Sequence, residues 1–252
     1  MRKPVKYNYR CKYILVLGCM LIFFSNCNTA EDIITSYGKE ITVKRQIGSF
    51  SSMIAGEKFD IELRQDSTKE GELEMTAGEN VIDGYVTEIK NGELMIENRN
   101  KFNWVRNLKV RQKVVVYFKT INKIQINGSA KFTCKDTIKQ KVFSLSHDGL
   151  ENAEFTVLIN NLDFKGTNTG GVILKGRSYI FSVSVDNLSF LDSKGMRTDD
   201  TYITSFSKSD NYVDADKKLN VTLFGSGNVY YSINPTDLIN LSERGQGKII
   251  KR

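Results

Sequence analysis

Apolar and polar side chains alternate along most of the chain with the two-residue period of a β-strand. Phe59, Ile61 and Leu63 are separated by single acidic residues, and the segment 114–118 repeats the pattern. Such alternation places apolar and polar side chains on opposite faces of an extended strand. The only proline after residue 4 is Pro235, which suits uninterrupted strands because proline cannot donate to a β-ladder. The pattern predicts a nearly all-β body.

The first part of this body, at about 44–127, is predicted to consist of strands that precede the repeating coils, and it includes one hairpin. In residues 89–94, Asn91 and Gly92 stand between two alternating runs. Both residue types tolerate the positive φ angles of a two-residue type I′ turn, so the two runs are expected to form antiparallel strands.

From Ile126 onward, short apolar stretches separated by polar turns recur at similar but unequal intervals. Seven apolar anchors mark the repeats: Phe132, Phe155, Ile173, Phe190, Val213, Val229 and Ile249. An irregular unit of about 20 residues with two or three brief strands is typical of one coil of a parallel β-solenoid. The strands of a β-sandwich also recur at short intervals, so periodicity favours the solenoid without excluding the sandwich.

The beginning of the chain has the three parts of a secretory signal. Five basic residues and no acid precede an apolar run at 13–24, which Ser25, Asn26 and Cys27 follow. A run of twelve residues is shorter than the ~20 that a membrane-spanning helix needs. The ending resembles the lipobox at which bacterial lipoproteins are cleaved and acylated on cysteine, except that Gly or Ala is usual in place of Asn26. The alternative is a plain signal cleaved near Thr29 or Ala30, with an incidental cysteine at position 27.

These features predict three parts: a signal peptide at 1–26, a tether at 27–43 and a β-solenoid domain at 44–252. Two or three acyl chains on Cys27 would attach the protein stably to a membrane. We therefore expect a lipid-anchored protein of the cell envelope, at the outer membrane, facing either the periplasm or the cell surface.

Removal of the signal lowers the net charge of the chain. The whole chain carries a net charge of +7, but five of its 36 basic residues and none of its 29 acidic residues precede Cys27. The remaining chain has a net charge of only +2, so nucleic acid is not an expected partner. Cys11 and Cys19 leave with the signal, and Cys134 then has no partner for an intramolecular disulfide.

The side chains that could carry chemistry are few, and no catalytic, cofactor or metal site is predicted. His147 is the only histidine, and its neighbours Ser146 and Asp148 would point to the other side of an extended strand. We interpret His147 as a solvated turn residue. Cys134 follows the alternation of Phe132 and is interpreted as a small buried apolar residue rather than a nucleophile.

Three aspartates, Asp210, Asp214 and Asp216, could offer oxygen ligands to calcium. Lysines flank them, and their spacing fits neither an EF-hand loop nor the nonapeptide calcium repeat. Metal binding is therefore the less favoured interpretation of these three aspartates.

A basic and aromatic stretch is the candidate ligand surface. Phe102, Trp104 and Arg106 lie among further cations, and the cations outside this trio are Arg99, Lys101, Lys109, Arg111 and Lys113. An exposed tryptophan beside cations would suit a sugar ring or an anionic polysaccharide. The alternative, which the residues favour, is a solvated hairpin with Trp104 folded into the body.

Related strings at three turns carry a family resemblance: Asn127–Ala130, Gly225–Tyr230 and Gly245–Ile249. Further matching strings are Ile47–Phe50, Phe59–Leu63, Glu79–Ile82, Gly92–Leu94 and Asn234-Pro235. In order and spacing they resemble the GIN-domain family, the auto-transporter adhesin head domain of lipoproteins of Bacteroidetes-type bacteria. The resemblance implies a right-handed parallel β-helix, an envelope location and a role in adhesion. The segments 146–149 and 208–211 lack paired glycines, which leaves the register of the middle coils open.

The sequence therefore predicts a non-enzymatic envelope lipoprotein that binds a polysaccharide, an envelope protein or an external surface. The rival is a polysaccharide lyase or hydrolase with carboxylates such as Asp199 and Asp200, an idea that rests on fold analogy alone. A second rival is a periplasmic structural or sensing partner.

Overall fold

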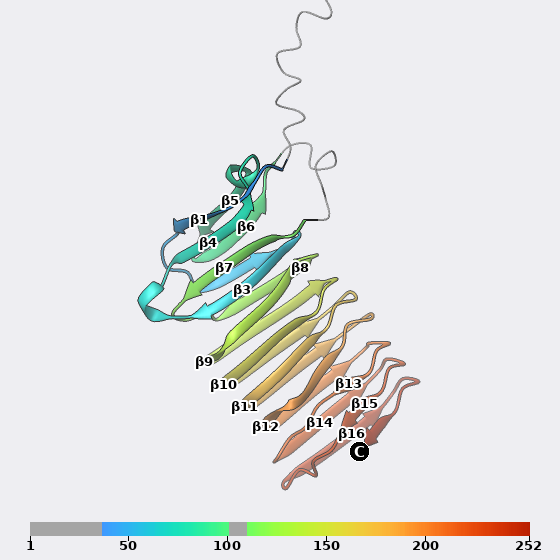
Figure 1. Cartoon of the computed structure of the whole chain (residues 1–252). Helices are drawn as coiled ribbons and strands as arrows, with labels where there is room; N and C mark the ends of the chain where they lie inside the picture. The colour runs from blue at the N-terminus through green and yellow to red at the C-terminus, as the bar shows by residue number, and fades with distance from the viewer. Residues whose placement is uncertain (1–36, 101–109) are drawn as a thin grey trace, which may run out of the picture.

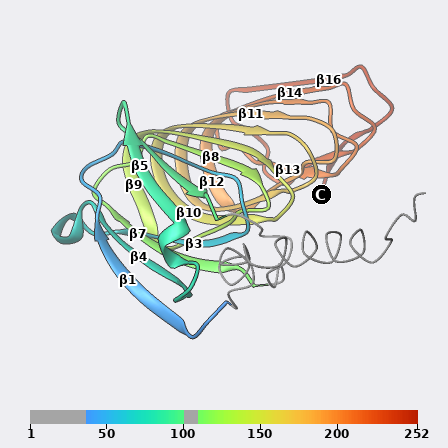
Figure 2. The ribbon, with the colours of Figure 1, turned by 90° about the horizontal axis from the view of Figure 1, so that it is seen from above.

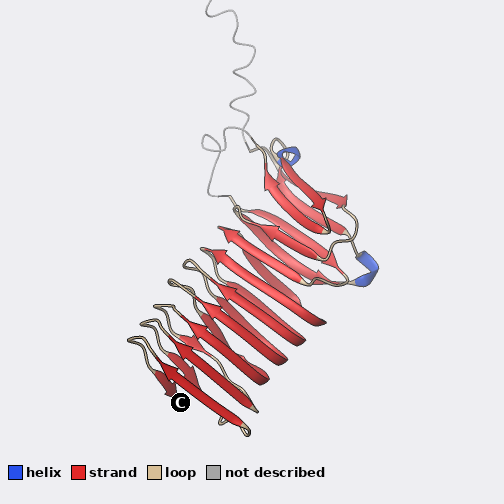
Figure 3. Cartoon of the chain, turned by 180° about the vertical axis from the view of Figure 1, so that it is seen from behind, coloured by secondary structure: helices blue, strands red, loops and turns tan. Residues whose placement is uncertain are grey.

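The computed structural model describes residues 37–100 and 110–252. These residues form seventeen strands and two short 3-10 helices, η2 (Ser67–Lys69) and η3 (Ile82–Gly84), and all the strands are connected in one sheet system. The strands wind into a stack of coils that runs from the capped N-terminal part to the C-terminus (Figure 1, Figure 3). The predicted all-β solenoid is confirmed.

The regular coils begin with four long strands that pair in parallel: β9 (Lys131–Gly149), β10 (Ala153–Gly166), β11 (Val172–Val185) and β12 (Leu191–Ser205). Two rows of shorter strands continue the two halves of β12. One row contains β13 (Asn211–Tyr212), β15 (Val229–Tyr231) and β17 (Ile249–Lys251), and the other contains β14 (Lys218–Leu223) and β16 (Leu238–Glu243). Figure 2 shows the coils as stacked loops.

The predicted length of the repeat is confirmed, but most of the chosen anchors are not in register. One row of paired positions, with one member in each successive coil, consists of Thr133, Glu154, Ile173, Asp192, Tyr212, Tyr230 and Ile250. Val229 and Ile249 are true partners, whereas Phe155 pairs with Leu174. Phe155 and Val213 lie two positions away on the same buried face, where apolar residues also occur, whereas Ile173 and Phe190 are shifted by one position and are only partly buried.

The N-terminal strands do not simply precede the solenoid, as we expected, because two of its coils are made from them. Strand β2 (Ser52–Ala55) lies between β6 (Glu93–Asn98) and β8 (Lys123–Gly128), in parallel with both. Strand β3 (Phe59–Gln65) lies in the same way between β7 (Gln112–Phe118) and β9. The coil that comes first in the sequence is therefore second in the stack.

Antiparallel strands cover the N-terminal end of the stack. Strand β4 (Glu72–Gly78) pairs with β7 and with β1 (Glu40–Gln46), and β5 (Tyr85–Lys90) pairs with β6. The turn between β5 and β6 has φ angles of 51° at Asn91 and 75° at Gly92, which confirms the predicted hairpin. Strand β1 begins at Glu40, inside the segment expected to be a tether.

Inward-facing side chains form one continuous core along the stack, with Phe132, Phe143 and Phe155 among its largest members. Later coils also bury small hydroxyl side chains. Ser189 donates to the carbonyl oxygen of Gly170 at 2.9 Å, and Ser207 donates to that of Ser189 at 2.6 Å. Both of these hydroxyls bond to the backbone of the coil before them, which satisfies their polarity inside the core.

Candidate functional site

The trio proposed as a ligand surface, Phe102, Trp104 and Arg106, lies outside the described residues, and so does Cys27. Three other members of the basic stretch can be placed. Arg99 lies 2.8 Å from Glu97, and Lys113 lies 3.6 Å from Glu40. In the described part of the stretch, the positive charge is therefore largely balanced by acidic partners.

Arg111, the third of these cations, joins segments that are distant in the sequence. Its Nε lies 2.5 Å from Asp60 Oδ1, and its Nη1 lies 3.4 Å from Glu151 Oε1. Its Nη2 donates to the carbonyl oxygens of Phe59 and Ser129 at 2.9 and 2.7 Å. The planar guanidinium can satisfy all four acceptors at once, so Arg111 acts as a structural clamp on the interleaved coils.

His147 is fully buried at the end of β9, so its interpretation as a solvated turn residue is wrong. Its Nε2 lies 2.8 Å from the carbonyl oxygen of Glu151, and the Gly149 amide donates to Nδ1 at 3.4 Å. A neutral ring with its proton on Nε2 satisfies both contacts. Burial lowers the pKa of His147 and favours this neutral form.

Cys134 lies on β9, partly buried against the core. Burial raises the pKa of its thiol to about 11. The thiolate is the nucleophilic form, and it is scarce at neutral pH for such a thiol. This environment agrees with a packing role.

The carboxylates proposed for the rival enzyme are bound to cations of neighbouring coils. Asp199 lies 2.8 Å from Arg177 on one side and 2.9 Å from Lys217 on the other, and Asp200 lies 3.6 Å from Lys218. The bond from Lys217, with Arg177 beside it, lowers the pKa of Asp199. A general acid needs a raised pKa to hold a proton at neutral pH, so Asp199 is unsuited to that role.

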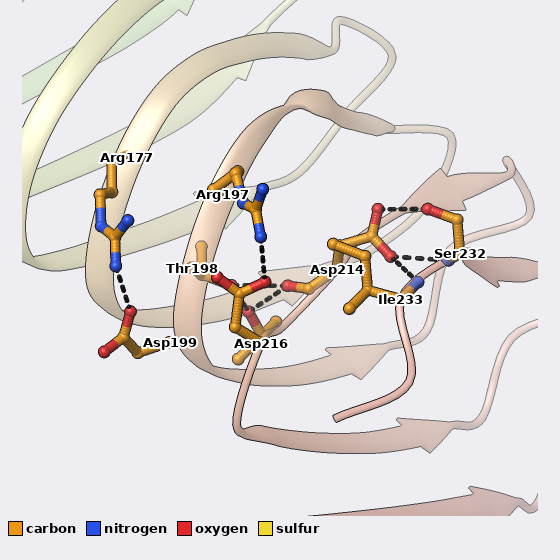
Figure 4. Close-up of polar contacts among 9 residues, drawn as sticks. Arg177, Arg197, Thr198, Asp199, Asp214, Asp216, Ser232 and Ile233 are labelled. Carbon is orange, nitrogen blue, oxygen red and sulfur yellow. Dashed lines mark hydrogen bonds and ion pairs between the residues drawn. The ribbon is translucent and has the colours of Figure 1, made fainter. Parts of the chain in front are cut away.

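The three aspartates considered for calcium also connect neighbouring coils, and Figure 4 shows two of them, Asp214 and Asp216. Asp214 accepts hydrogen bonds from the Ser232 amide, the Ser232 hydroxyl and the Ile233 amide at 2.6 to 2.9 Å. Asp216 accepts from Arg197 at 2.8 Å, and Asp210 accepts from the Asn228 amide at 2.9 Å. Within the described residues, no group of three or more His, Cys, Asp or Glu side chains could hold a metal ion.

Close packing, rather than left-handed backbone, accounts for the paired glycines at the later corners. Gly225, Gly227, Gly245 and Gly247 are not among the positive-φ glycines. A Cβ at Gly227 would lie 2.1 Å from the carbonyl oxygen of Ser209, in the preceding coil. Close approach of stacked backbones therefore requires glycine at these positions.

Two columns of aromatic rings, which the sequence reasoning missed, run along the C-terminal coils. Phe206 and Phe224 stack with ring centroids 4.7 Å apart, and Tyr212 and Tyr230 stack at 5.0 Å. The Arg252 guanidinium lies 4.2 Å from the centroid of the Tyr230 ring. The two rings of each pair come from successive coils, so a correct repeat register would have revealed both columns. The neighbouring coil covers at least one face of each ring, which reduces the surface left for a sugar to stack on.

A family model described as "Putative auto-transporter adhesin, head GIN domain" matches residues 49–235. The chain belongs to this family. GIN-domain membership and the confirmed β-solenoid agree with the resemblance seen in the turns. Membership indicates an adhesin-like protein of the cell envelope or surface. Comparison with curated proteins found no match.

Solved structures similar to this GIN-domain chain share its fold at low sequence identity. A putative adhesin from Bacteroides fragilis is 20% identical with a TM-score of 0.79, and the match covers 85% of this chain and 97% of that one. A protein from Parabacteroides distasonis described as a putative lipid binding protein is 18% identical with a TM-score of 0.66, covering 86% and 99%. Among the described residues, no helix is long and apolar enough to span a membrane.

Proposed function

We propose that the chain is a non-catalytic binding protein, held to the outer membrane by lipid on Cys27, whose β-solenoid mediates adhesion to a glycan or to a partner protein. One observation carries the non-catalytic part of this proposal. The side chains that could perform chemistry hold the coils together: Asp199 and Asp216 pair with cations of neighbouring coils, and His147 is buried and neutral. Such a body is suited to presenting a fixed surface.

The lipid anchor is tested by Cys27→Ser and by inhibition of signal peptidase II. Each treatment should leave the precursor uncleaved or move the protein out of the membrane fraction. Mass spectrometry of the wild type should show acyl chains on Cys27. A Cys27→Ser protein that is processed, soluble and equal in mass to the wild type would contradict the anchor.

Adhesion to anything external requires a body that faces outward. Protease treatment of intact cells should degrade the body of the wild type, while a periplasmic control protein stays intact. Protection of the body in intact cells, with degradation after permeabilisation, would instead support the periplasmic structural or sensing role.

The ligand surface is tested on a glycan and matrix-protein array that also carries lipids, because one similar structure is described as a lipid binding protein. Trp104→Ala should weaken binding, since the indole is the largest flat surface in the stretch. Phe206→Ala provides a control, because this aromatic residue lies in the stacked column of the C-terminal coils. Equal binding by the wild type and Trp104→Ala would remove the 102–106 surface from the proposal.

The enzyme alternative predicts release of products from acidic or neutral polysaccharides. Release that is lost in Asp199→Asn or Asp200→Asn, with the fold unchanged by circular dichroism, would overturn the non-catalytic assignment.

A further inference from the structure

The last coil of the solenoid leaves core side chains exposed. Ile239 and Leu241 continue the rows of Leu219 and Val221, which are fully buried. Ile239 and Leu241 are nevertheless 45% and 39% exposed. In the described residues, no further coil or capping strand covers these side chains (Figure 1). Repeat proteins usually present a polar face on a coil that no neighbour covers, so these exposed apolar side chains form an unusual surface.

The backbone of the last coil is also open. Strand β16 pairs only with β14 among the described strands. The amides of Leu238 and Arg244 donate to carbonyl oxygens of the coil that contains β14, at 3.1 and 2.8 Å. Because N–H groups alternate in direction along a strand, the amides of the odd-numbered residues Ile239, Leu241 and Glu243 point away from β14. Strand β16 thus offers an unused edge for β-ladder pairing.

The opposite end of the stack is protected against such pairing. The edge strand β1 carries Glu40, Lys44 and Arg45, and the edge strand β5 carries Glu88 and Lys90. Charges on edge strands discourage unwanted pairing. Strand β16 has no charged residue from Leu238 to Ser242.

The charges around this open end determine what can cover it. Residues 238–252 contain three basic residues besides Arg244 and one acidic residue, Glu243, which is bound to Lys248 and to the Ile249 amide. A second copy stacked by the same end would bring like charges together, which is unfavourable. Strand β1, the first described strand, lies at the other end of the stack (Figure 1).

We propose that an acidic, extended segment of another polypeptide binds this end by adding a strand to β16. Its apolar residues would cover Ile239 and Leu241, and its carboxylates would face the cations of the last coil. Main-chain pairing to an exposed edge, with side-chain contacts for specificity, is an established mode of peptide recognition. The inference rests on the proposed binding role but on neither the lipid anchor nor the 102–106 surface.

The test uses the full chain in detergent and two fluorescent heptapeptides, one alternating glutamate with valine and one alternating lysine with valine. Fluorescence anisotropy should show saturable binding of the acidic peptide and binding at least about tenfold weaker for the basic one. Leu241→Pro should weaken binding by about tenfold, because it removes an outward amide and an apolar contact but leaves the bonds to β14 intact. Ile239→Lys is a second variant that keeps the backbone donor.

The charge requirement is tested by Lys248→Glu with Lys251→Glu, and we expect a loss of about tenfold. Lys141→Glu with Lys165→Glu makes the same charge change at exposed positions of earlier coils and should leave binding unchanged. Circular dichroism checks the folding of every variant.

Equal binding of the two peptides, or full binding by both Leu241→Pro and Ile239→Lys, would overturn the proposal. Self-association that Leu241→Pro abolishes would instead assign the end to a second copy. Glycan binding without peptide binding would overturn this inference alone.

Discussion

The two regions of the solenoid reach similar packing by different chain paths. In the regular coils, each strand pairs with the strand of the next coil along the sequence, as Glu154 does with Ile173. In the N-terminal region, Asp60 of β3 pairs with Lys113 and with Lys131, which both lie several strands further along the chain. Long-range pairs must close large loops before they contribute stability. A parallel coil can therefore be inserted between two later ones when its own side chains complete the core.

The largest expected loss of stability distinguishes a core position in the interleaved coils from a position in the exposed last coil. Leu63 is fully buried on a strand that has neighbours on both sides, and Leu63→Ala should lower the free energy of unfolding by about 3 kcal/mol. Leu241→Ala, at the partly exposed end, should lower it by less than about 1 kcal/mol. Urea denaturation measures both. Equal losses would contradict the exposure of the last coil.

The next effect tests the close stacking of the regular corners. Gly227→Ala places a methyl group against the Ser209 carbonyl, and we expect a loss of about 2 kcal/mol because both atoms belong to backbones that cannot move independently. Ser226→Ala, in the same turn, is the control and should have little effect. A Gly227→Ala protein as stable as the control would show that the corner can widen.

A smaller effect is expected from the connection between two coils at Asp214. Asp214→Ala removes the acceptor of the Ser232 and Ile233 amides, and the loss should be about 1 to 2 kcal/mol. Asp214→Asn keeps one oxygen acceptor and should lose less. Thermal unfolding by circular dichroism compares the two, and equal losses would mean that charge, rather than hydrogen bonding, decides the contact.

The smallest expected effect on stability depends on pH and comes from His147, which lies at the boundary between the two regions. The pKa of His147 is lowered in the folded chain, so between that pKa and the ordinary value of about 6.5 only the unfolded state binds the proton. Its contribution to stability is complete above pH 6.5 and falls below it, by up to about 1.4 kcal/mol per pH unit. Lowering the pH from 7.5 to 5.5 should reduce the free energy of unfolding of the wild type more than that of His147→Gln. Urea denaturation at each pH measures both. Parallel curves would contradict the neutral buried ring.

Local signals predicted the parts of the structure that depend on neighbouring residues. The Asn91-Gly92 turn sets the β5–β6 hairpin because its backbone preference acts over a few consecutive residues. The repeat length was also visible, because each coil needs a similar number of residues to return to its starting row. The register of the coils was not visible in the sequence, because a shift of two residues keeps the same face inward and leaves the apolar pattern unchanged.

The alternation, spacing and turn residues of the chain were enough to predict the strands, the coil length and the hairpin. The three-dimensional arrangement of the coils was needed to establish that β2 and β3 lie between later strands and that Asp199 and Asp214 connect coils. It was also needed to establish that His147 is buried and that β16 has an unpaired edge among the described strands. The difference comes from distance along the chain. Alternation and turn preferences are properties of a few consecutive residues, whereas burial and charge pairing depend on which coils become neighbours.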